Sequence, residues 1–181
     1  MNSSKEIIIK FSKRKLVFIF LGSLFFVLFG INILYNHKEY DYFLILVGFI
    51  SVVFFGFSLV FSLDKIFTKL PGLIINKKGI VDNSSGVKAG FIPWEDITKI
   101  DITTVGNNSF VNLIVRDPKK YINKNKNFLK KFFVTINYKT FKTAIGIPAT
   151  ALDCDFENLF NIINGEFQKH KSNSKISATK Q

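Results

Sequence analysis

Hydrophobic positions fill two continuous runs near the N-terminus, from Leu16 to Tyr35 and from Tyr42 to Leu63. Neither run contains Asp, Glu, Lys, Arg or His. About 20 residues of α-helix, at ~1.5 Å rise per residue, reach across the ~30 Å hydrocarbon core of a bilayer. The pattern therefore predicts two membrane-spanning helices. Because the runs carry no charge, we expect them to act as an anchor and not as an ion or proton path.

The polar link between the runs, residues 36–41, is too short to form a domain, so residues 16–63 should form an antiparallel helical hairpin. Basic residues precede the first run and follow the second, whereas the link carries only Lys38. By the positive-inside rule, both termini are expected in the cytoplasm, with residues 1–15 as a basic cytoplasmic segment. A cleaved signal peptide would have a shorter apolar core and a small-residue cleavage site, and the first run has neither.

Four glycines predict how the hairpin packs. If the turn centres on Glu39, Gly22 lies at the depth of Gly56, and Gly30 at the depth of Gly48. Small residues let two membrane helices approach closely, so the four positions are expected to form one seam. The alternative is that glycine is simply common in membrane spans. A seam would leave the neighbouring aromatic side chains facing lipid, namely Phe25, Phe29, Phe54 and Phe57.

Beyond Leu63 the pattern changes to short apolar pieces separated by Gly-, Asn- and Ser-containing turns, which is typical of antiparallel strands. A C-terminal segment then repeats apolar residues at helical spacing, from Phe156 to Phe167. The sequence therefore predicts an α+β membrane protein with one cytoplasmic domain over residues 72–168 and a polar, disordered tail over 169–181. The expected strands cover residues 73–75, 80–81, 90–94, 99–104, 110–116 and 143–148.

The segment from Pro118 to Leu152 contains eight lysines and no acidic residue. Asp117 and Pro118 resemble a helix start, and aromatic residues recur between the lysines at roughly helical spacing. A basic amphipathic helix is expected here. One interpretation is a surface helix that packs its aromatic side on the domain. The other, compatible with it, is contact with anionic lipid headgroups through Lys119, Lys120, Lys124, Lys126, Lys130 and Lys131.

Two stretches carry a family resemblance: Gly72–Ile80, which reads GLIINKKGI, and Ile92–Ile97, which reads IPWEDI. They resemble bacterial pleckstrin-homology-like (PH-like) domains. From about Lys10 to Phe167, the chain is similar to a small family of bacterial membrane proteins with two N-terminal spans and such a domain. The resemblance implies a bent antiparallel sheet capped by one C-terminal helix, with the basic helix after Arg116 as an insertion. It leaves the strand order beyond Arg116 open.

The residues offer little for catalysis. His37 and His170 lie in the hairpin link and the polar tail, far in sequence from the one cysteine, Cys154. No metal-ligand spacing, phosphate-binding loop or nucleophile motif occurs, so no enzyme activity, cofactor or metal site is expected. The formal charge of +12 comes almost entirely from lysine, and the two arginines, Arg14 and Arg116, are too few for typical nucleic-acid recognition.

Together with the resemblance, these patterns predict a bacterial inner-membrane protein. It would be a membrane-anchored PH-like binding or scaffold module on the cytoplasmic leaflet, contacting a protein partner or anionic lipid headgroups. The alternative is an accessory subunit of a transporter or membrane enzyme, with the hairpin as the functional contact.

Overall fold

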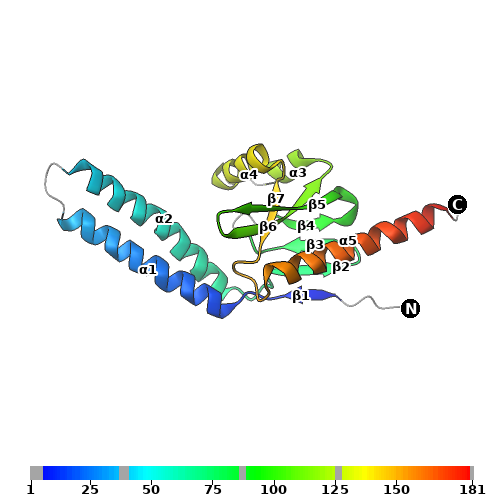
Figure 1. Cartoon of the computed structure of the whole chain (residues 1–181), viewed down its shortest axis with the longest axis horizontal. Helices are drawn as coiled ribbons and strands as arrows, with labels where there is room; N and C mark the ends of the chain where they lie inside the picture. The colour runs from blue at the N-terminus through cyan, green and yellow to red at the C-terminus, as the bar shows by residue number, and fades with distance from the viewer. Residues whose placement is uncertain (1–5, 37–40, 86–88, 125–127, 180–181) are drawn as a thin grey trace. The chain divides into compact units, whose positions relative to one another are not determined.

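The computed structural model describes residues 6–36, 41–85, 89–124 and 128–179. The chain forms two compact units (Figure 1), one of residues 11–69 and the other of residues up to Lys10 together with those from Leu70 onward. The first unit is a pair of long apolar helices, and the second contains antiparallel sheets and helices. The predicted α+β class, with two long apolar helices at the N-terminus, is confirmed.

The helical unit consists of α1 (Lys13–Asn36) and α2 (Tyr42–Phe67), which lie side by side. Asp41 caps α2, because its side chain accepts a hydrogen bond from the Leu44 amide at 3.2 Å. At the other end of the pair, the Lys13 ammonium donates to the Ile66 carbonyl. Both helices are long and apolar enough to cross a membrane, and little of their apolar surface is buried within the protein.

Lys65 lies in the last turn of α2 and is 2% exposed. Its ammonium lies 4.9 Å from the centre of the Phe11 ring and 5.4 Å from that of Phe61. Aromatic faces attract a cation, and the lysine stem adds apolar contact. A lysine that the sequence places just beyond the second span is therefore part of the helix packing.

The first sheet of the other unit has the order β1-β2-β3-β4 and is antiparallel throughout. Its strands are β1 (Ile7–Ile9), β2 (Leu73–Asn76), β3 (Gly79–Asp82) and β4 (Gly90–Pro93). Strand β1 precedes the helical pair in sequence, yet Ile9 pairs with Leu73 and Ile7 with Ile75. The domain therefore begins before the helices and not at residue 72. A strand of three residues carries too little periodicity for the sequence to predict it.

Local geometry explains the turn between β2 and β3. Asn76 accepts a hydrogen bond from the Lys78 amide at 2.9 Å, and Gly79 has a φ of +155°. A side chain at Gly79 would collide with the Ile92 carbonyl of β4, so only glycine fits. The following 3₁₀ turn, η1 (Trp94–Asp96), buries Trp94, whose indole donates to the Asn76 carbonyl at 2.8 Å. Trp94 is thus a core residue.

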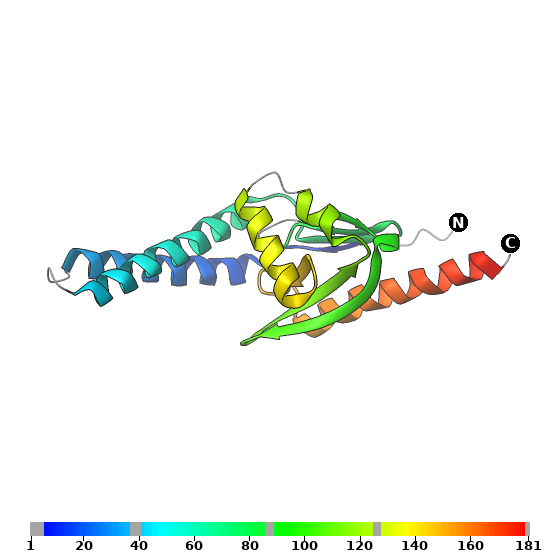
Figure 2. The same ribbon diagram turned by 90° about the horizontal axis from the view of Figure 1, so that it is seen from above.

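The second sheet has the order β5-β6-β7 and is also antiparallel. It contains β5 (Ile97–Val105), β6 (Asn108–Val115) and β7 (Ile145–Pro148), and β5 and β6 form a long curved pair (Figure 2). Two helices, α3 (Pro118–Asn123) and α4 (Phe128–Phe141), are inserted between β6 and β7. The single basic helix predicted after Arg116 is therefore two helices, and the strand that follows them returns to β6.

The core of this unit lies between the sheets and α5 (Phe156–Thr179). Asp155 accepts a hydrogen bond from the Asn158 amide at 2.7 Å and so starts the helix. Side chains from one face of the second sheet pack with those of α5, and all are buried: Val111, Leu113, Val115, Ile145, Ile147, Leu159, Ile163 and Phe167. Helix α4 lies on the opposite side of this sheet from α5 (Figures 1 and 2).

The polar segment 169–181 was predicted to be disordered, but α5 continues as helix through Thr179. Lys169 forms an ion pair with Glu166 at 2.6 Å, one turn earlier. Ser172 and Ser174 donate to carbonyls four residues back. Polar composition predicted disorder, yet no glycine or proline follows Gly165, so nothing in the sequence breaks the helix.

Helices α1 and α2 separate Ile9 in sequence from the rest of its domain. The pairing of β1 with β2 nevertheless predicts that Ile9 stabilises that domain. Ile9→Ala should lower the free energy of unfolding by about 2 kcal/mol, because it leaves a cavity beside a buried strand. Ile8→Ala is the matched control, since the adjacent Ile8 side chain is exposed. Unfolding of the full chain in detergent can be followed by the emission of Trp94, the only tryptophan. Equal losses from both variants would contradict a structural role for β1.

Candidate functional site: the basic insertion between β6 and β7

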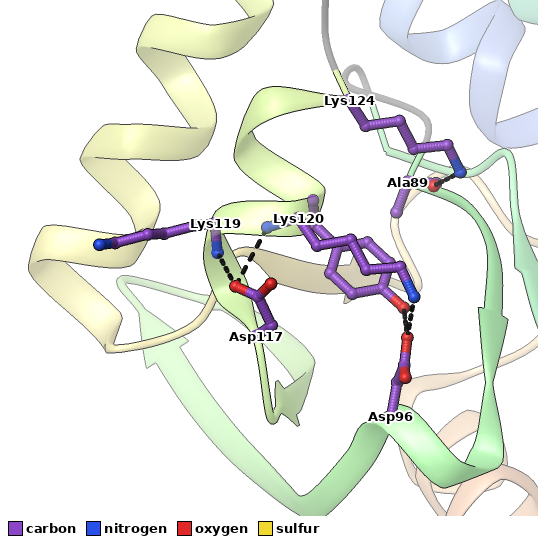
Figure 3. Close-up of polar contacts among 7 residues, drawn as sticks. Ala89, Asp96, Asp117, Lys119, Lys120 and Lys124 are labelled. Atoms are coloured by element: carbon purple, nitrogen blue, oxygen red, sulfur yellow. Dashed lines mark hydrogen bonds and ion pairs between the residues drawn. The ribbon is translucent and has the colours of Figure 1, made fainter.

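Helix α3 begins at the predicted position. The Asp117 side chain accepts hydrogen bonds from the amides of Lys119 and Lys120, at 3.0 and 3.2 Å (Figure 3). Pro118 occupies the first helical position, where a missing amide proton costs nothing. The cap and the proline thus set the direction in which the insertion leaves β6.

One carboxylate ties α3 to the start of β5. Asp96 accepts a hydrogen bond from the Lys120 ammonium at 2.7 Å and another from the Tyr121 hydroxyl at 2.6 Å (Figure 3). These bonds, the one from Lys120 first, hold the pKa of Asp96 below its ordinary value. Burial, reinforced by the hydrogen bond to Asp96, raises the pKa of Tyr121, which therefore stays a neutral donor. Tyr121 is the buried residue of α3.

Lys124 makes a second link between the insertion and the first sheet. Its ammonium donates to the Ala89 carbonyl at 3.1 Å, just before β4 (Figure 3). The adjacent Gly90 has a φ of +71°, and a side chain there would lie 3.1 Å from the Lys124 nitrogen. Glycine at this position therefore allows the backbone turn and leaves room for the Lys124 side chain.

The six lysines predicted to contact lipid do not all have the same role. Lys120 and Lys124 hold α3 against the sheets through the contacts above. Lys119 and Lys131 are exposed. Lys126 lies outside the residues that the structure describes, and the side chain of Lys130 is outside it as well. Sequence spacing could not distinguish the lysines that hold α3 from the exposed ones, because the partner of Lys120, Asp96, lies 24 residues away.

Helix α4 leaves four of its described apolar side chains exposed. Phe128 is 80% exposed and Phe132 51%, and Ile136 continues the same stripe at i+8. Phe133 flanks the stripe and packs its ring edge to face with that of Phe132, at 5.9 Å between centres. Only Val134, at 2%, is fully buried among the described side chains of α4. The helix thus does not pack Phe128, Phe132 and Phe133 on the domain.

The predicted seam of the helical pair is present at one glycine pair. Side chains added at Gly30 would lie 3.0 Å from the Gly48 carbonyl, and those at Gly48 3.1 Å from the Gly30 carbonyl. The backbones therefore touch here, as two small residues allow. Serines extend the seam, since Ser23 donates to Ser58 at 2.8 Å and Ser51 to the Phe26 carbonyl at 3.0 Å.

The seam prediction is wrong for Gly22 and Gly56, because both face open space. The buried residues of α1 are Leu16, Ser23 and Gly30, each seven residues from the next. Seven residues fall only ~20° short of two turns, whereas eight go ~80° past them. Glycines eight residues apart therefore cannot share this seam. The seven-residue spacing of the small residues Ser23 and Gly30 was a readable signal. The outward-facing Phe25, Phe29, Phe54 and Phe57 are exposed, as expected.

The residues with catalytic potential lie apart. Cys154 is half-buried, and His170 stacks near Trp94 with its ring 3.8 Å from the Glu95 carboxylate. Within the described ranges, no group of three or more His, Cys, Asp or Glu residues is placed to hold a metal ion.

Comparisons with protein-family models, with curated proteins and with solved structures found no match to this chain.

The seam predicts different tolerance at the two glycine pairs. Changing Gly30 and Gly48 together to Leu should destabilise the helical pair by about 1–3 kcal/mol through overpacking. The same double change at Gly22 and Gly56 should have little effect, because space is open there. Thermal melts of the full chain in detergent, followed by far-UV circular dichroism, compare the two. Similar melting of both double variants would exclude the seam.

The lowered pKa of Asp96 predicts a pH-dependent contribution to stability. The ionised carboxylate favours the folded state above its ordinary pKa of 3.8, and this contribution is lost as pH falls below 3.8 towards the folded value. Asp96→Asn should thus cost less than about 1 kcal/mol near neutral pH, since Lys120 is half-exposed, and nothing at strongly acidic pH. The free energy of unfolding, measured by Trp94 emission at neutral and at strongly acidic pH, tests this.

Asp101→Asn is the control, because the Asp101–Lys99 pair is exposed on β5 and should contribute almost nothing. A loss at Asp96 that persists unchanged in acid would contradict the ionic origin of the contact.

Proposed function

We propose that this protein is a membrane-anchored PH-like binding module whose α3–α4 insertion contacts the anionic cytoplasmic leaflet of a bacterial inner membrane. Helices α1 and α2 would be the anchor, and the face formed by Phe128, Phe132, Phe133 and Ile136 with the neighbouring lysines would be the contact.

Two features support the anchor. Large apolar side chains cover the outside of α1 and α2, a surface that is costly in water and favourable in lipid. Strands β1 and β2 flank the helices and pair with each other. Since both strands belong to one sheet, two spans would return the chain to the side where it started. The basic residues on both flanks favour the cytoplasm for that side.

The PH-like assignment is supported by the strand order. Two antiparallel sheets are followed by one C-terminal helix, and the β5–β6 pair is curved (Figure 2). The helical pair would then be an insertion between β1 and β2, and α3–α4 a second insertion between β6 and β7. A fold does not by itself define an activity, so the function depends on the inserted segments.

The outward face of α4 is the observation that carries the proposal. Fully burying one phenylalanine side chain contributes about 1.5–3 kcal/mol, and each lysine near anionic headgroups about 1 kcal/mol. Interfacial helices combine these two terms. The absence of acidic residues from Pro118 to Leu152 removes the repulsion that a negatively charged leaflet would otherwise meet.

A tryptophan reporter tests this contact. In Phe132→Trp protein reconstituted into vesicles, brominated phosphatidylglycerol should quench the new indole, since it would lie among the acyl chains. Quenching should fall with rising salt, because exposed charges are screened beyond about 10 Å at 0.1 M. It should also fall when Lys119, Lys131 and Lys139 are changed to Gln.

Phe91→Trp is the matched control: Phe91 is a similarly exposed phenylalanine, but it lies on β4. Both variants retain the buried Trp94 as a constant background. Equal quenching of the two reporters, or equal quenching in neutral and anionic vesicles, would contradict the proposal. An exposed reporter that is quenched by no lipid would favour a protein partner for this face.

A further inference from the structure

A cleft of about 320 Å³ lies between α4 and the face of the β5–β7 sheet that points away from the core. Thr103 pairs with Phe110 and Asn112 pairs with Gly146 across the strands, so their side chains share one face of the sheet. Asn137 and Phe141 of α4 complete the walls with other residues. The volume lies at the lower end of the range for small-molecule sites.

The floor of the cleft is not packed like a core. Asn112 occupies the middle of β6 and is 4% exposed. Its side-chain nitrogen donates to the Thr103 hydroxyl at 2.6 Å, but no described residue donates to its oxygen, Oδ1. No buried side-chain nitrogen or oxygen among the described residues lacks a hydrogen-bond partner, so Oδ1 is not enclosed. It is open to the cleft and can accept a hydrogen bond from a molecule bound there.

Gly146 keeps this oxygen accessible. Glycine lies directly opposite Asn112 on β7, and a Cβ added there would lie 3.1 Å from Oδ1. A larger residue on this strand would fill the space above the carboxamide. The glycine thus preserves an acceptor at the bottom of a mostly apolar cleft.

We propose that this cleft binds an uncharged, largely apolar small molecule that donates a hydroxyl or N–H hydrogen bond to Oδ1 of Asn112. Among the residues that the structure describes, no charged side chain lines the cleft, so a charged group would enter without compensation. Phe110, Phe141, Val105 and Pro148 provide the apolar contact. An acceptor at the floor selects a donor and disfavours a phosphate or carboxylate. The site is separate from the outward face of α4 and does not depend on its contact with lipid.

Photolabelling of the full chain in lipid nanodiscs tests the proposal. The probes are 1-decanol carrying an aliphatic diazirine and the methyl ether of the same compound, which lacks the O–H donor. The alcohol should label peptides covering residues 103–112 and 137–148 with half-saturation at about five-fold lower concentration than the ether, as one net hydrogen bond implies. Label on α1 and α2 reports partitioning into lipid and should not distinguish the probes.

Three variants make the test specific. Asn112→Leu should remove the preference for the alcohol, and Gly146→Ala should weaken labelling by the alcohol by covering Oδ1. Asn108→Leu, at the exposed start of β6, should change neither. Trp94 emission verifies the fold, and if Asn112→Leu disturbs it, Gly146→Ala decides alone. Equal affinity for alcohol and ether, label confined to α1 and α2, or an unchanged preference in the altered proteins would overturn the proposal.

Discussion

The antiparallel pairing of β1 with β2 is the contact on which the rest of this structure depends. It joins residues 7–9 to residues 73–75, which α1 and α2 separate in the sequence. Three apolar residues on each side are enough, because Ile9 and Leu73 are buried in a core that the other strands complete. The long-range pair makes the helices an insertion within one domain. It also means that a fragment beginning at residue 72 lacks an edge strand of the first sheet.

The second insertion is held in a different way. Polar contacts from α3 reach Asp96 and the Ala89 carbonyl, and they are partly exposed. Such contacts contribute little stability but specify geometry. They hold the lysine-rich segment against the sheets while α4 leaves its phenylalanines uncovered. The apolar face is therefore presented by the domain and is not a product of loose packing.

The two faces of the β5–β7 sheet illustrate the division between stability and binding. One face carries branched aliphatic residues that pack with α5, and alternation along β6 puts Phe110 and Asn112 on the other. Close packing stabilises a core face, since side chains beside a void lose van der Waals contacts. The opposite face retains a cleft, a small residue at 146 and a polar floor. These features have no advantage for packing, which is why we assign them to a ligand.

The sequence alone determined the long apolar helices, most of the strands and the helix start at Asp117 and Pro118. These depend on local periodicity and on contacts a few residues apart. Only the tertiary structure decided the place of β1, the partner of Lys120, the outward orientation of α4 and the seam partners of Gly30. Each depends on which distant surface is available for pairing. The glycine prediction was partly wrong because it matched the glycines only by their depth along the two helices. Two residues also need the same direction around the helix axis to share a seam. Residues seven apart on one helix meet that condition, whereas residues eight apart do not.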